Sequence, residues 1–158
     1  MSLLPATPAL SPRSLFESLL RYALGGVFLY AALSKIIDPH AFSLDIANYR
    51  LLPDGLLPYA ALLVPALELV AGIFVIAGPM KGEAAAWIAL LLLGFLFGEG
   101  QAILRGLDLS CGCFGKGSGK VGWLSIGRNA LLLAASVWVI LEQRRYRADF
   151  VRHPGAAG

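Results

Sequence analysis

The sequence predicts an all-α, polytopic membrane protein, a four-transmembrane-helix bundle formed by a single domain. Hydrophobic residues make up 58% of the 158-residue chain and charged residues only 15%, whereas soluble domains average about 45–50% and about 25%. Four apolar segments are each about 20 residues long, enough to cross about 30 Å of hydrocarbon. The net charge of +3 comes from arginines near the end of the chain, which fits a membrane-surface anchor better than a nucleic-acid partner.

The first span is expected from about residue 16 to residue 37. Residues 1–15 contain Pro5, Pro8 and Pro12 and form a poor helix, and Asp38-Pro39 ends the span. A cleaved signal peptide is the competing interpretation of this start. The length of the apolar region argues against it, as does the lack of a clear small-x-small cleavage site.

A short helix lying in the membrane interface is expected after the first span. The segment that follows this span is too polar to cross a bilayer. Phe42, Ile46 and Tyr49 recur in it at helical spacing, opposite Asp45 and Asn48. Such a helix would rest its apolar face on the membrane or on the end of the bundle.

The second and third spans should form an antiparallel hairpin, because a tight Gly-Pro turn joins them. The loop that holds both cysteines follows the third span and precedes the fourth. The expected boundaries are 56–78 for the second span, 83–104 for the third, 105–121 for the cysteine loop, 122–141 for the fourth span and 142–158 for a basic tail.

The distribution of Lys and Arg predicts the orientation. An even number of spans places both termini on one side, together with the turn between the second and third spans. That side carries Arg13, Arg21, Lys81, Arg144, Arg145, Arg147 and Arg152, while the other carries Lys35, Arg50, Arg105, Lys116 and Lys120. Because cationic loops stay in the cytoplasm, we expect cytoplasmic termini and an extracytoplasmic cysteine loop.

Small and polar residues recur at 3–4-residue spacing along every span, a pattern that lets helix backbones approach closely in lipid. These faces are Gly26/Tyr30/Ser34, Ala61/Pro65/Glu68/Gly72, Gly94/Gly98/Gln101 and Ser125/Asn129/Ser136. We expect them to be the packing faces of the bundle, with Gly94 and Gly98 as a GxxxG pair.

Four ionisable residues fall inside predicted spans, where an unpaired charge costs about 3 kcal/mol or more. They are Lys35, Glu68, Glu99 and Arg128. One interpretation is a structural ion-pair network, with the Lys35 amine extending to the headgroups. The other is a supporting polar site beneath the cysteine loop, completed by Tyr30 and Asn129, that relays protons or binds a ligand.

Cys111 and Cys113 are the two cysteines of the chain, and one residue separates them. A disulfide across one residue closes a small, strained ring that is readily reduced, as a catalytic or transfer disulfide must be. Lys116 and Lys120 would favour the thiolate. Inert structural cysteines stay possible, as does a soft ion such as Cu(I) on two thiolates. Without a further Cys or a nearby His, however, no metal site is predicted.

The same residues carry a resemblance to a known family. The segments concerned are Cys111–Gly115, Val121–Trp123, Arg128-Asn129, Arg21–Gly25, Ser34–Pro39, Tyr49–Pro53 and Pro65–Gly72. In their order and spacing they resemble the methylamine utilisation protein family MauE, a group of the DoxX-like four-helix membrane proteins. The resemblance covers about residues 14–141.

The resemblance implies thiol–disulfide exchange in the bacterial inner membrane. The partner would be a periplasmic thioredoxin-like protein such as MauD, in the maturation of disulfide-rich exported proteins that include the methylamine dehydrogenase small subunit. It assigns the redox pair to Cys111 and Cys113, and charged positions to Lys35, Glu68 and Arg128. DoxX relatives are linked to quinone reduction, so a membrane quinone is the candidate cofactor.

Two hypotheses of different classes follow. In the first, the protein is a thiol–disulfide oxidoreductase that relays electrons between its partner and the membrane, in a direction that the sequence does not specify. In the second, it is a non-catalytic assembly partner that anchors a thioredoxin-like protein. A small-solute transporter is a third class, but it would leave the paired cysteines unexplained.

Overall fold

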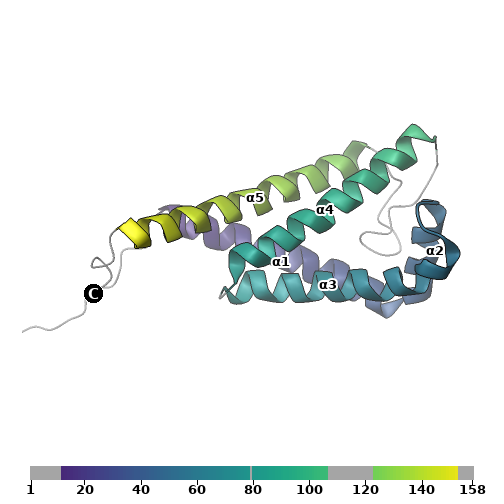
Figure 1. Cartoon of the computed structure of the whole chain (residues 1–158), viewed down its shortest axis with the longest axis horizontal. Helices are drawn as coiled ribbons and strands as arrows, with labels where there is room; N and C mark the ends of the chain where they lie inside the picture. The colour runs from purple at the N-terminus through teal and green to yellow at the C-terminus, as the bar shows by residue number, and fades with distance from the viewer. Residues whose placement is uncertain (1–11, 79, 107–122, 153–158) are drawn as a thin grey trace, which may run out of the picture.

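The structure, a computed structural model, describes residues 12–78, 80–106 and 123–152, and contains no strand within them. The elements are α1 (Pro12–Ile37), α2 (Pro39–Asn48), the 3₁₀ turn η1 (Asp54–Leu56), α3 (Leu57–Ala77), α4 (Lys81–Leu104) and α5 (Trp123–Arg152). Helices α1, α3, α4 and α5 are each long and apolar enough to cross a membrane, and α2 lies at one end of the bundle (Figure 1). The predicted all-α, four-span class is confirmed.

Two helices extend beyond their predicted ends. Helix α1 begins at Pro12 rather than near residue 16, because proline suits the first helical turn, where its missing N–H has no intrahelical partner to lose. Helix α5 continues to Arg152 through most of the predicted basic tail, a stretch rich in the helix formers Glu, Gln and Arg. The cysteines fall between residues 107 and 122, outside the described residues.

Local sequence accounts for the two sharp changes of direction at Asp38 and Gly78. The Asp38 carboxylate caps α2 by accepting a hydrogen bond from the Ala41 N–H at 3.0 Å, and Pro39 occupies the first helical position. Gly78 ends α3 with φ of +89°, a left-handed conformation that glycine adopts without a Cβ penalty. Helix α4 then runs back antiparallel to α3, as predicted (Figure 1).

Helices α1 and α3 approach each other closely at two glycines. A Cβ on Gly25 would lie 3.0 Å from the Gly72 carbonyl oxygen, and a Cβ on Gly72 would lie 3.2 Å from the Gly25 oxygen. The expected packing residue Gly26 is exposed, and a Cβ there meets no neighbouring atom within 4 Å among the described residues. The predicted face of the first span was therefore wrong by one residue, which is a rotation of about 100° around a helix.

The other predicted faces divide into two outcomes. Those of the second and fourth spans are confirmed, since Ala61, Pro65, Glu68, Gly72, Ser125, Asn129 and Ser136 are all buried. The GxxxG expectation for the third span is wrong, because Gly94 is exposed and a Cβ there would touch nothing within 4 Å. Gly98 is buried, but it faces the side chains of Tyr49 and Leu51 rather than a helix backbone.

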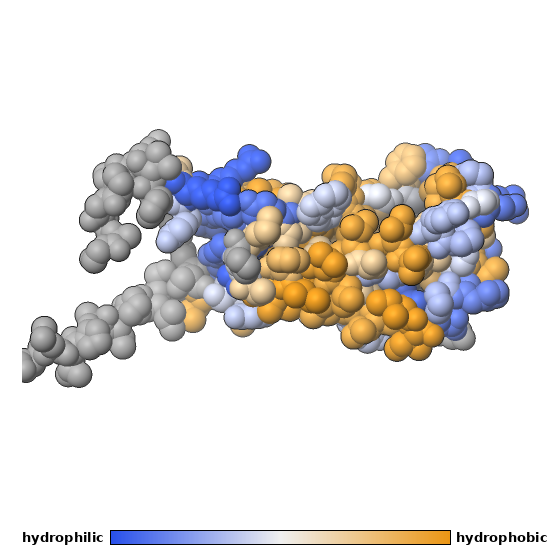
Figure 2. Space-filling view, turned by 60° about the horizontal axis from the view of Figure 1, so that its bottom comes forward, coloured by the Kyte–Doolittle hydropathy of each residue, from blue (hydrophilic) through white to orange (hydrophobic). Residues whose placement is uncertain are grey.

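The two ends of the bundle differ from the middle. On the face that Figure 2 shows, apolar side chains form a belt across the middle, with hydrophilic residues at both ends. At one end, ion pairs join Lys81 to Glu17 and Arg147 to Glu83, the latter at 2.7 Å. These pairs bring the start of α1, the Gly78 turn and the far part of α5 to the same end, as a bundle with an even number of spans requires.

Candidate functional site

The centre of the candidate site is an ion pair between α1 and α3. Lys35 Nζ donates to both oxygens of the Glu68 carboxylate, at 2.8 and 2.7 Å, and both side chains are 1% exposed. The rings of Phe42 and Phe95 lie 5.3 and 5.4 Å from the same amine, close enough for cation–π attraction. The Lys35 cation is thus held by a carboxylate and by two aromatic rings.

Helix geometry places this pair. Lys35 lies in the last turn of α1, on the same face as the buried residues Leu24 and Phe28, so its side chain enters the interior. A cation is also favoured at that helix end by the helix dipole. Glu68 follows Pro65 by three residues on the buried face of α3. The interpretation in which Lys35 extends to the headgroups is wrong.

A second polar contact joins α4 and α5. The Asn129 side-chain amide donates to Glu99 Oε2 at 3.1 Å, and both residues are buried. A void of about 10 Å³ touches both Glu68 and Asn129, which is near the smallest volume that admits one water molecule. We refer to Lys35, Glu68, Glu99 and Asn129 together as the buried polar cluster.

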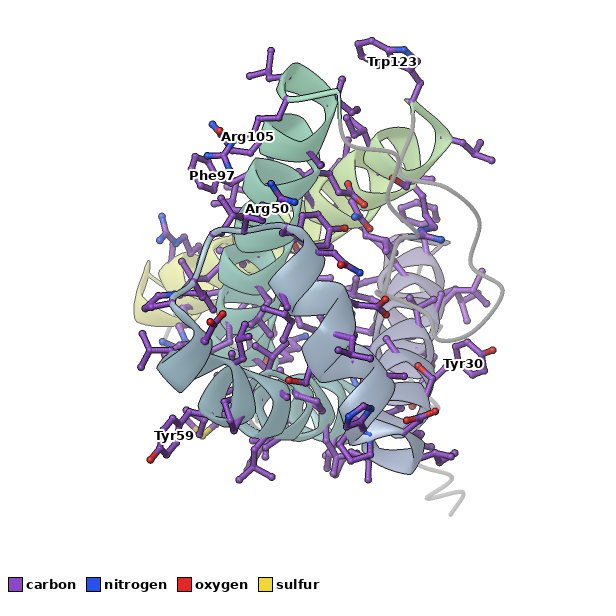
Figure 3. All side chains as sticks on the ribbon, turned by 90° about the vertical axis from the view of Figure 1, so that its right-hand side faces the viewer. Tyr30, Arg50, Tyr59, Phe97, Arg105 and Trp123 are labelled. Carbon is purple, nitrogen blue, oxygen red and sulfur yellow. The ribbon has the colours of Figure 1, made fainter. Side chains whose placement is uncertain are left out.

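Two of the predicted site residues lie outside this cluster. Tyr30 is 61% exposed and points away from the bundle (Figure 3), because it lies on the opposite side of α1 from Phe28 and Lys35. Arg128 is partly buried on α5, next to Asn129 in the chain. Arg128 is thus partly buried beside a cluster residue in the chain, whereas Tyr30 faces outward.

Cys111 and Cys113 lie outside the described residues, so their geometry stays a prediction. The helix ends that flank their segment are described. Helix α4 ends at Leu104, five residues after Glu99, and α5 begins at Trp123, six residues before Asn129. At 1.5 Å per residue, the Glu99–Asn129 contact lies about 8–9 Å along the helices from these ends.

The aromatic rings around Lys35 and the role of Arg21 were not predicted from the sequence. Arg21 Nε and Nη2 donate to the carbonyls of Val75 and Ile76 at 3.1 and 2.9 Å, and so complete the end of α3. The signal was present, because a cation near a helix carboxyl end is favourable. In the parts of the chain that the structure describes, no three His, Cys, Asp or Glu side chains are grouped to hold a metal ion.

The fold and the buried polar cluster define the class of this molecule. It is a multi-pass, four-helix membrane protein that keeps charged side chains in its interior, in one half of the bundle. Charged groups in such positions are costly and usually serve function.

The comparisons with known proteins identify the family within this class. Residues 13–142 match the family described as methylamine utilisation protein MauE, and the chain belongs to that family. It is 35% identical over 120 residues to MauE of Paracoccus denitrificans, covering 75% of this chain and 64% of that protein. It is 37% identical over 108 residues to MauE of Methylorubrum extorquens, covering 67% of this chain and 58% of the relative.

The chain therefore spans less than two thirds of the length of these relatives. The match to a second Paracoccus protein, MauE of Paracoccus versutus, is similar: 37% identity over 124 residues, covering 64% of that protein. No solved structure matches the chain.

Proposed function

We propose that the protein acts in methylamine utilisation as a membrane thiol–disulfide redox protein. Cys111 and Cys113 form its redox pair, and a thioredoxin-like protein on the periplasmic face of the bacterial inner membrane is its partner. The family and the names of its relatives support the pathway. The observation that carries the redox proposal is the buried polar cluster, which lies in the half of the bundle from which the cysteine segment leaves.

The exchange balances with a dithiol partner. The two partner thiols reduce the Cys111–Cys113 disulfide through a mixed disulfide, and the partner cysteines are oxidised to a disulfide. Two electrons and two protons then reside on Cys111 and Cys113. A lipid-soluble quinone would be the acceptor: as the Cys111–Cys113 disulfide re-forms, the two thiols would give up two electrons and two protons to it.

The cluster has the chemistry to move the protons of that second step. Reoxidation releases a proton from each thiol, and carboxylates inside a membrane bundle commonly relay protons. Glu99 lies nearer to the helix ends that flank the cysteine segment, and Glu68 lies deeper. Glu68 and Asn129 border one small void, which brings the two contacts close together, although apolar side chains form most of its lining. In this proposal Lys35 and Asn129 position the carboxylates.

Thiol trapping in native membranes tests the proposal. A membrane-impermeant thiol reagent is applied before and after reduction, and the Cys111/Cys113 pair is titrated against a thiol buffer. We expect reversible labelling from the periplasmic side and a potential more oxidising than that of a structural disulfide. Cysteines that never oxidise would overturn the relay, and labelling from the cytoplasmic side alone would overturn the orientation.

Cysteine variants separate the relay from an assembly role. Cys111→Ser and Cys113→Ser should each abolish partner oxidation, and one of them should accumulate a mixed disulfide with the partner. A double variant that still supports full maturation of exported disulfide proteins would favour the non-catalytic assembly partner instead.

A further inference from the structure

The end of the bundle that carries α2 also carries a groove. It has a volume of about 470 Å³ and lies between α2, the first half of α3 and the second half of α4. This volume falls within the range of small-molecule sites. The walls are mostly apolar and include Leu51, Leu52, Val64 and Leu90.

The groove exists because α3 and α4 diverge. They meet at the Gly78 turn and separate toward the end where α2 lies (Figure 1). On the α4 wall, Gly94 and Gly98 leave space that a side chain would fill. A Cβ on Gly94 would meet nothing within 4 Å, and one on Gly98 would make only ordinary contacts, at 3.7 Å or more. The small residues thus enlarge the groove and do not close a helix contact.

The groove opens to the outside of the bundle, at the level of the apolar belt. Leu90 and Phe97 line it, and they are 57% and 63% exposed. In a membrane these side chains face acyl chains, so a molecule can enter sideways from the lipid. The walls favour a long apolar chain, because Asp45 and Tyr49 are the only lining residues with polar side chains in the described part of the chain.

Two arginines lie next to the groove without lining it. Arg50 lies between Tyr49 and Leu51, which both line it, and Arg105 Nη1 reaches the Arg50 carbonyl at 3.5 Å. Figure 3, which looks onto this end of the bundle, shows Arg50 and Arg105 on the same side of it. Both arginines are exposed. Neither forms an ion pair with another residue in the described ranges.

A cationic rim above an apolar groove is complementary to one kind of molecule in the bilayer. We propose that the groove binds an anionic phospholipid, with its phosphate at Arg50 and Arg105 and one acyl chain along the Gly94–Gly98 wall. Basic sites between transmembrane helices bind anionic headgroups in this way. One acidic residue, Asp45 on α2, lines the groove and precedes Arg50 by five residues. We place the phosphate at the two arginines and not beside this carboxylate. This inference does not depend on the redox function.

Lipid binding to the purified full-length chain tests the proposal. The protein is placed in nanodiscs of phosphatidylcholine with increasing phosphatidylglycerol, and bound lipid is counted by native mass spectrometry after release. We expect selective retention of phosphatidylglycerol. At about 1 kcal/mol per arginine near a membrane surface, Arg50→Gln or Arg105→Gln should weaken retention about fivefold, and the double variant about thirtyfold.

The groove itself is tested by Gly94→Leu, with Gly26→Leu as the matched control on an exposed, open position of α1. Gly94→Leu should remove the retained lipid while thermal unfolding in detergent stays close to that of the parent, and the control should retain it. The arginine variants lie on the exposed rim and keep the test valid if Gly94→Leu does not fold.

Two outcomes would overturn the proposal. The first is equal retention of phosphatidylcholine and phosphatidylglycerol by the parent protein. The second is a neutral quinone, extracted from the native membrane protein, that Gly94→Leu displaces and the arginine variants do not. That result would assign the groove to a different ligand while leaving the cysteine chemistry untouched.

Discussion

The pairing of Lys35 with Glu68 makes a strong prediction about substitutions in the interior. Removing one partner of a buried ion pair leaves the other charge without compensation and typically costs about 3–5 kcal/mol. Both side chains are 1% exposed, and the amine touches both carboxylate oxygens. We therefore expect Glu68→Leu and Lys35→Met each to destabilise the bundle by about 3–5 kcal/mol.

The double variant should behave differently. Apolar side chains of similar size often replace a buried ion pair at no net cost, so Lys35→Met/Glu68→Leu should fall within about 2 kcal/mol of the parent. Phe42 and Phe95, which lie over the Lys35 amine, would then pack against methionine, whose thioether makes favourable contacts with aromatic rings.

The assay is reversible unfolding in mixed detergent micelles, followed by the loss of helix signal as a denaturing detergent is added. The four proteins complete a double-mutant cycle. A double variant that loses as much as the sum of the single variants would refute the pairing argument. The same proteins then report on function. The proposed relay requires the folded double variant to reoxidise its cysteines more slowly than the parent, and unchanged reoxidation would make the cluster purely structural.

Three further predictions concern other parts of the bundle. Gly25→Ala should cost about 1–3 kcal/mol by overpacking the α1–α3 contact, while Gly26→Ala should change stability little; equal effects would contradict the observed face. Arg21→Met should cost about 1.5–3 kcal/mol by removing two charged hydrogen bonds to the end of α3, measured by thermal unfolding against the exposed control Arg145→Met. Burial, with a smaller contribution from Asp38, raises the pKa of Asp45 above its ordinary value of 3.8, so the folded protein keeps a proton that the unfolded chain loses. Stability should therefore fall as pH rises from 3.8 through the raised pKa, and Asp45→Asn should remove this decline.

The sequence predicted those features that depend on composition and on long periodic segments. The four spans, the short helix after the first span and the hairpin at Gly78 follow from hydropathy and from turn residues. It also identified Lys35, Glu68 and Glu99 as charges that need compensation. The sequence did not predict which groups compensate them. The position of a charge within a span indicates that burying it is costly, but it does not indicate where its partner lies. The neutral Asn129 was expected beside the charges, but its bond to Glu99 depends on how α4 and α5 are rotated.

The two errors in helix faces have a common cause. Small residues at 3–4-residue spacing are compatible with close packing, but they do not show which side of the helix the neighbour occupies. On α1, Gly26 begins the small and polar series, whereas Gly25 is followed at that spacing by the large residues Phe28 and Leu29. The inward positions of Leu24, Phe28 and Lys35 nevertheless place Gly25 in the interior. On α4, Gly94 and Gly98 have the expected spacing, yet the divergence of α3 turns them into the wall of a groove.

The distribution of polarity inside the bundle favours a functional origin for the buried polar cluster. Toward the end that carries the Gly78 turn, the interior is a close-packed apolar core that includes Val75, Ala85, Ile88 and Val139, each fully buried. Toward the other end, the interior positions are occupied by the buried polar cluster. An apolar core would be at least as stable there, since burying a charge pair is at best an even exchange with hydrophobic packing. Stability alone therefore gives no reason for charges in one half only. The redox chemistry that we propose for the cysteine segment would give one, and in that case the cluster would contribute to redox turnover rather than to folding stability.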